Sequence, residues 1–196
     1  MQKPDWTLTR TSNPSGLAVS LDEAKNHLRV SGSGQDTEIT LLVQASTEKL
    51  ERDINRSILQ ATWQQAMACF PAEGYPIELM VKPATLVSSI TYVDSDSVTQ
   101  TLDPSSYSFS AGRQVVFNES DSLWPEVKAA TRSDKVFVNF TCGVADSDCV
   151  NPLIKQAILL ETGRAYFDPA QENQSNSDNG KTYEMLVRKL LSEKYV

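Results

Sequence analysis

The sequence predicts an α+β protein: a helical hairpin and bundle with an inserted antiparallel β-sheet region and a tethered C-terminal helix. Three observations support this fold class. One long amphipathic run covers residues 36–55, apolar residues then alternate with a period of two, and a helical period returns at Asn151. The expected parts are an N-terminal arm at 1–18, a helical core of 19–59 plus 151–196, and an inserted antiparallel β subdomain at 60–150.

The first 18 residues are polar and are interrupted by Pro4, Pro14 and Gly16. Such a composition favours an extended segment without regular structure of its own. We therefore expect a loosely held arm, in which Trp6 and Leu8 provide the attachment.

A helical hairpin follows the arm. Ser20-Leu-Asp-Glu23 is a capping box, because the Ser20 hydroxyl and the Glu23 carboxylate can each accept from the other's backbone amide. The short helix it begins should end near Leu28, and the glycines at 32 and 34 should turn the chain into the long helix. Asn55 closes that helix with a residue type that tolerates a left-handed conformation.

The β region consists of short segments rich in β-branched and aromatic residues, separated by turn residues. Asp94–Ser97 and Ala111-Gly112 are expected as hairpin turns. The predicted strands are 62–67, 77–81, 87–93, 98–102, 114–117 and 135–140.

Two more helices are expected after the β region. Asn151 is a good N-cap and Pro152 suits the first helical position, so an apolar helix should run towards Phe167. Residues 168–181 are rich in Asn, Ser, Gln and Asp and predict a mobile loop. From Thr182 the sequence is amphipathic again, which indicates a helix at the end of a polar tether.

Composition excludes several classes of protein. With 18 Lys and Arg against 25 Asp and Glu, the net charge is −7. A general nucleic-acid or anionic-membrane binder needs excess positive charge, so neither is expected. No apolar run approaches a membrane span, and the start of the chain lacks the apolar core of a signal peptide, so we expect synthesis in a cytosol.

No catalytic or metal-binding constellation is visible. His27 is the one histidine and has no patterned partner, so a surface or packing role is expected. Cys69, Cys142 and Cys149 match neither a zinc site nor a redox pair, and we expect reduced, mostly buried thiols. The acid pairs stand among turn residues and lack a calcium-loop pattern. We therefore expect no catalytic residues, no metal site and no cofactor.

Several stretches together resemble the head–tail connector (adaptor) proteins of long-tailed double-stranded DNA phages and of related gene-transfer particles. The resemblance spans residues 18–196. Two features depart from the family pattern, which tends to have Gly at the position of Asn55 and a shorter loop than 168–181. The matching stretches are Ser20–Val30, Glu51–Arg56, Gln60–Trp63, Phe70-Pro71, Ser88–Asp94, Thr99–Asp103, Trp124-Pro125 and Pro152–Leu160.

The resemblance implies a non-enzymatic, structural virion protein at the head–tail junction, forming a dodecameric ring beneath the portal. DNA would pass through its channel without specific binding, and the ring would carry the next neck or tail-completion protein. Because a wall that repels phosphate suits DNA passage, acidic residues are expected along the bore.

The apolar helix faces are the expected contact surfaces, because polar sequence before the last helix favours contact with another subunit. The candidate subunit interface consists of Ile39, Leu42, Val43, Leu50, Ile154 and Ile158. The candidate portal-docking residues are Tyr183, Leu186, Val187, Leu190, Leu191 and Tyr195.

Two alternatives remain open from the sequence. The first is another neck or tail-completion protein of the same particle, which only the identity of the partner would distinguish. The more remote one is a small hydrolase or sugar-binding module built on the β region. It would need a pocket with convergent carboxylates and aromatics, for which Trp63, Tyr92 and Trp124 are the aromatic candidates.

Overall fold

The computed structural model describes residues 6–119, 123–127, 134–168 and 178–192. The chain divides into two compact units. The β unit comprises Met1–Asn13 with Ala61–Gly143, and the helical unit comprises Pro14–Gln60 with Val144–Val196. Each unit has a hydrophobic core of its own. The predicted α+β fold class is confirmed.

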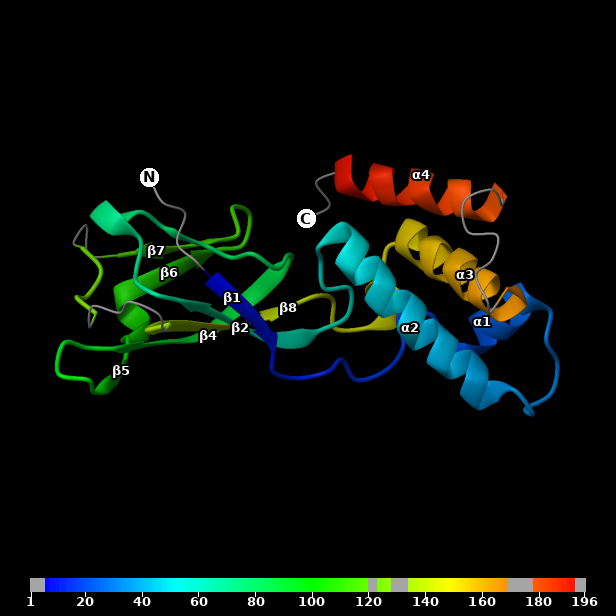
Figure 1. Ribbon diagram of the computed structural model, residues 1–196, viewed down its shortest axis with the longest axis horizontal. Helices are drawn as coiled ribbons and strands as arrows, with labels where there is room; N and C mark the ends of the chain where they lie inside the picture. The colour runs from blue at the N-terminus through cyan, green and yellow to red at the C-terminus, as the bar shows by residue number, and fades with distance from the viewer. Residues whose placement is uncertain (1–5, 120–122, 128–133, 169–177, 193–196) are drawn as a thin grey trace. The chain divides into compact units, whose positions relative to one another are not determined.

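Four α-helices build the helical unit (Figure 1). The predicted capping box is present: Glu23 N donates to Ser20 Oγ at 3.2 Å, and Ser20 N donates to Glu23 Oε2 at 2.8 Å. Leu153 N donates to Asn151 Oδ1 at 2.8 Å, which confirms that N-cap as well. Among the described helices, none is both long and apolar enough to cross a membrane. The bounds are α1 Leu21–Leu28, α2 Asp36–Ile54, α3 Pro152–Phe167 and α4 Asp178–Ser192.

The last helix differs from the expected helix on a tether. α4 begins at Asp178, four residues before the predicted start, and it packs along α3 and α2 (Figure 1). Its Tyr183 and Leu190 belong to the buried core of the helical unit. Most of the predicted mobile loop, residues 169–177, lies outside the described residues.

α2 ends as predicted, with Asn55 in the left-handed region at φ 51° and ψ 46°. Any side chain with a Cβ is strained there, and asparagine is among the residues that tolerate the conformation best. We expect Asn55→Ala to lower the free energy of unfolding of the helical unit by about 1 kcal/mol. Asn55→Gly, the residue more usual in the resembling family, should match the wild type in urea unfolding followed by circular dichroism at 222 nm. An Ala variant as stable as the Gly variant would contradict this account.

The β unit contains two antiparallel sheets. The larger has the order β1-β2-β8-β4-β5 and the smaller the order β3-β7-β6. Along β8, alternate residues from Val136 to Cys142 are completely buried, which places this face of the large sheet on the core. The bounds are β1 Trp6–Arg10, β2 Ala61–Met67, β3 Ile77–Glu78, β4 Ala84–Val93, β5 Thr99–Thr101, β6 Tyr107–Ser110, β7 Val115–Asn118 and β8 Val136–Cys142.

Two strands were not predicted. β1 pairs with β2 along its whole length, so residues 6–10 form an edge strand where a loosely held arm was expected. The segment was missed because its alternation is short and lies among turn residues. β6 pairs with β7 through the predicted Ala111-Gly112 turn. The predicted Asp94–Ser97 turn is also present, with Asp94 Oδ1 accepting from the amides of Asp96 and Val98.

Candidate functional site

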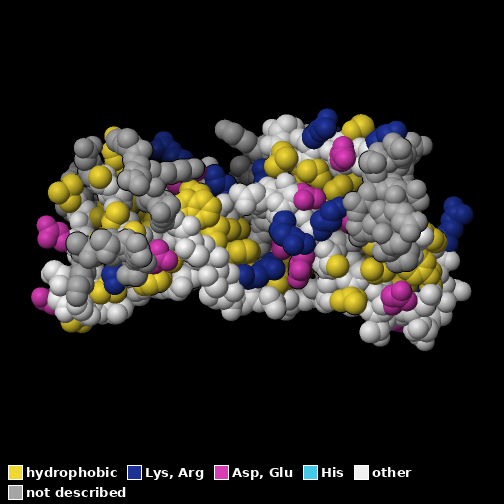
Figure 2. Space-filling view, in the orientation of Figure 1, with side chains coloured by type: hydrophobic (Ala, Val, Ile, Leu, Met, Phe, Trp, Pro, Cys, Tyr) yellow, Lys and Arg dark blue, Asp and Glu magenta, His cyan; other side chains and the backbone are white. Residues whose placement is uncertain are grey.

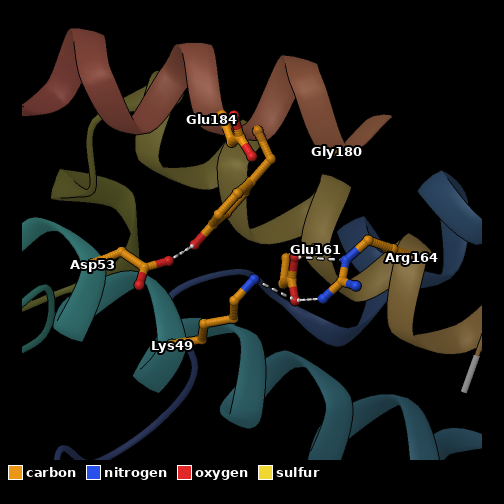
Figure 3. A pocket seen from close by; sticks show the side chains of 7 residues that line it. Lys49, Asp53, Glu161, Arg164, Gly180 and Glu184 are labelled. Carbon is orange, nitrogen blue, oxygen red and sulfur yellow. Dashed lines mark hydrogen bonds and ion pairs between the residues drawn. The ribbon is translucent and has the colours of Figure 1, made fainter. Parts of the chain in front are cut away.

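An open pocket of about 290 Å³ lies among α2, α3 and α4 (Figure 3). Each helix supplies residues three or four positions apart, a spacing that turns side chains to one face of a helix. The pocket is therefore a consequence of how α4 lies across the other two helices. Its lining residues are Lys49 and Asp53 from α2, Glu161 and Arg164 from α3, and Gly180, Tyr183 and Glu184 from α4.

Glu161 is the centre of the charged groups in this pocket. It is only 4 % exposed, yet Lys49 Nζ lies 2.9 Å from its Oε1 and Arg164 Nε donates to its Oε2 at 3.0 Å. In a second hydrogen bond, Arg164 Nη2 donates to Glu161 Oε1. Burial alone would raise the pKa of Glu161, but the bonds and charges from Arg164 and Lys49 outweigh burial and lower it. Glu161 therefore remains a carboxylate at neutral pH.

The second group of contacts ties α4 to α2. Tyr183 Oη donates to Asp53 Oδ2 at 2.7 Å, and Lys49 Nζ lies 4.4 Å from the centroid of the Tyr183 ring. Burial, followed by the bond to Asp53, raises the pKa of Tyr183, so its hydroxyl stays protonated and donating. Because Glu161 joins α2 to α3 and Tyr183 joins α4 to α2, these contacts hold the three helices together, and we call them the clamp on α4.

The predicted subunit-interface residues lie mainly in the core of the chain itself. Ile39, Val43, Leu50 and Ile158 are completely buried, and Leu42 and Ile154 are half-buried. A buried side chain cannot contact a second copy unless the unit opens. The amphipathic faces of α2 and α3 are covered by each other and by α4, so a subunit contact through this set stays a prediction that depends on Leu42 and Ile154.

The predicted portal-docking residues divide in the same way. Tyr183 and Leu190 are buried, Leu186 and Val187 are half-buried against the same core, and Leu191 is 54 % exposed. Tyr195 lies outside the described residues. The stripe that marked α4 as amphipathic thus faces mainly its own unit, and of the described set Leu191 is the most exposed.

Other apolar side chains of the helical unit are exposed instead. Leu41 on α2 is 63 % exposed, Phe167 at the end of α3 71 % and Met185 on α4 70 %. The sequence contained one usable signal: on α4, Met185 stands off the stripe that marked the amphipathic face. A search confined to the most regular stripe finds the core and misses these residues.

The aromatic residues proposed for a sugar or hydrolase pocket pack within the β unit. Trp124 is buried, stacks on Phe70 at 5.1 Å between ring centroids and donates from Nε1 to the Tyr75 carbonyl at 2.9 Å. Tyr92 contacts the same Phe70 edge-on, and Trp63 lies under the Arg10 guanidinium. These contacts use the three rings for packing, so the described residues lend the hydrolase alternative no support.

The cysteines correct one expectation. Cys142 is buried, and burial raises its pKa to about 12, but Cys69 and Cys149 are exposed although mostly buried thiols were expected. All three are free.

His27 is exposed at the α1–α3 contact, where its Nε2 lies 3.4 Å from the position a Gly163 Cβ would take. Within the described ranges, no three His, Cys, Asp or Glu side chains come together as metal ligands.

Comparison with known proteins agrees with this architecture. Residues 18–109, which run from α1 into β6, match the family of phage gp6-like head-tail connector proteins. The expected family resemblance is confirmed. None of the curated protein sequences compared matches the chain.

Solved structures share the fold of nearly the whole chain. A chain of the virion of the native gene transfer agent (GTA) particle has a TM-score of 0.76 at 16 % identity, covering 96 % of this chain and 97 % of that one. Two further matches come from necks of the GTA particle, one of the empty particle computed with C6 symmetry and one of the native particle computed with C12 symmetry. The TM-score of each is 0.75. Their identities are 15 % and 16 %, and 97 % of each chain is covered. At such identities these structures establish the shared fold.

Proposed function

We propose that this chain is a structural connector of a virion neck, which forms a ring between the portal and the tail or the next neck component. One observation carries the proposal: the connector fold extends through both units and α4, not only through the segment that the family match covers. The symmetry of the neck structures, C6 and C12, supports a ring. A dodecamer would agree with the second of these.

The clamp on α4 supports a structural role over an enzymatic one. Its charged and hydroxyl groups are committed to one another, and the bonds connect three helices into one body. A connector transmits load between neighbouring rings, so rigid helix contacts suit it. For portal docking we propose the exposed part of α4, with Leu191 from the predicted set and Met185 in addition to it.

The acidic balance supports DNA passage without adhesion. At −7 per copy, a ring of copies would repel phosphate unless its basic residues gathered on the bore. On the face drawn in Figure 2, basic and acidic side chains lie next to each other over the helical unit. We propose that acidic residues outnumber basic ones on the wall of the channel, and that the ring binds duplex DNA weakly at physiological salt.

The experiment that tests this function measures mass in solution, with and without the portal ring of the same particle. We expect the chain to assemble into a closed ring alone or on the portal, giving one discrete mass by sedimentation or native mass spectrometry. A chain that stays monomeric in both conditions would contradict the connector function. Assembly that ignores the portal but follows a tail-side component would favour the alternative of another neck or tail-completion protein.

A further inference from the structure

The large sheet of the β unit has a face that carries no charge. Its five strands contain one charged residue, Arg10, although 22 % of the chain is charged. Arg10 lies over the Trp63 ring, and Trp63 pairs with the buried Phe140, so all three belong to the core side of the sheet. The opposite side, here called the uncharged face, is formed by residues such as Thr9, Gln64, Asn139, Ser89, Leu86 and Thr141.

Hydrogen bonds order this face across three strands. Gln64 Nε2 donates to Asn139 Oδ1 at 3.0 Å, and Asn139 Nδ2 donates to Ser89 Oγ at 3.0 Å. The ladder therefore runs from β2 through β8 to β4 and keeps its side chains flat and engaged with one another. On either side of it, Thr9 on β1 is exposed and Leu86 on β4 is 59 % exposed.

An exposed sheet face without charge is unusual, because lysine and glutamate normally keep such surfaces from associating. Interfaces, in contrast, are depleted of charge at their centre, because burying an unpaired charge is costly. The chemistry of the face also limits its partner. It lacks the lysine and arginine that DNA or an anionic lipid surface requires, and the acids that a basic protein would recognise.

From these observations we infer that the uncharged face is a contact between copies of this chain in the proposed ring. Two copies each carrying −7 repel each other, and this repulsion is smallest where neither copy presents charge. The inference rests on the proposed connector function and adds the surface through which subunits associate. It names a surface other than the helix residues that the sequence had suggested.

The dimensions of the face agree with part of a subunit contact. The five strands lie about 4.8 Å apart and average about six residues, each of which adds about 3.3 Å of length. The face therefore covers roughly 400 Å². A standard interface buries roughly 800 Å² per partner. The face thus supplies about half of a typical contact, and the remainder comes from other exposed side chains. Association of the free chain should therefore be concentration-dependent.

Leu86→Glu tests the inference, because it places one charge on the uncharged face at an exposed position. We expect it to weaken ring assembly at least tenfold in Kd, measured by sedimentation of the chain alone and on the portal ring. Val98→Glu is the matched control: Val98 is 52 % exposed in the β4–β5 turn, off the sheet face, and its variant should assemble like the wild type. Thr9→Glu, on a different strand, should repeat the Leu86→Glu result.

Three outcomes separate the possibilities, once equal far-ultraviolet circular dichroism shows that the variants fold. Loss of assembly in Leu86→Glu and Thr9→Glu but not in Val98→Glu supports the inference. Normal assembly of both face variants overturns the inference and leaves the connector function intact. The same conclusion holds if the face variants assemble normally but no longer bind a tail-side component. A wild-type chain that never assembles overturns the connector function itself.

Discussion

Glu161→Gln is expected to lower the free energy of unfolding of the helical unit by about 3 kcal/mol, the lower end of the cost of breaking a buried ion pair. The substitution keeps the shape of the side chain but removes its charge. Arg164, whose side chain is 11 % exposed, then loses its hydrogen-bonded counter-charge and keeps only the attraction of the more distant Asp168. Lys49 is 37 % exposed and can turn to solvent, so the loss comes mainly from Arg164.

Urea unfolding at pH 7, followed by circular dichroism at 222 nm, measures this effect selectively. All three tryptophans, Trp6, Trp63 and Trp124, belong to the β unit, so their fluorescence reports on the other half of the chain. Glu184→Gln, at an exposed position of the same pocket, is the control and should change stability little. The double variant Glu161→Leu/Arg164→Met should recover much of the loss, because no buried charge remains unpaired. A Glu161→Gln variant as stable as the wild type would contradict the clamp.

The same contact should respond to pH in a defined direction. The pKa of Glu161 is lower in the folded chain than its ordinary value of 4.5. A carboxyl of this kind contributes its full stabilisation above the unfolded pKa and loses it as the pH falls through the lower folded pKa. The difference in stability between wild type and Glu161→Gln should thus be constant from pH 7 to pH 5 and shrink below about 4.5. A difference that grew on acidification would contradict the assigned direction.

Gln65→Leu is expected to destabilise the β unit by about 3 kcal/mol, since it leaves two partly buried backbone groups without their side-chain partner. Gln65 is 1 % exposed. Its Nε2 donates to the Glu78 carbonyl at 2.9 Å, and its Oε1 accepts from the Met80 amide at 3.0 Å. One side chain thus joins β2 of the large sheet to the segment at β3 of the small sheet.

Tryptophan fluorescence during urea unfolding is the measurement for this variant. Gln64→Leu is the matched control: the neighbouring residue points to the opposite face, where it bonds Asn139 and is half-buried. That change should cost less than about 1 kcal/mol, the usual worth of one hydrogen bond. Equal effects of the two substitutions would show that the bridge between the sheets is not what makes Gln65 important.

The local features of the fold could be predicted because neighbouring residues decide them. The capping box at Ser20, the N-cap at Asn151 and the left-handed end at Asn55 depend on atoms a few residues apart. Turn chemistry at Asp94 likewise predicted where β4 ends. β1 was missed for the opposite reason, because its partner strand lies more than fifty residues along the chain.

The sequence by itself determined the helix ends, the two periodicities, the acidic balance and the family resemblance, since these are properties of local pattern and composition. Only the tertiary structure decided which apolar faces are left for other subunits. An amphipathic stripe has the same pattern whether its cover comes from the same chain or from another copy. Ile39, Val43, Leu50 and Ile158 are covered by neighbouring helices of their own unit, whereas the uncharged face became visible only when five distant segments were aligned in register.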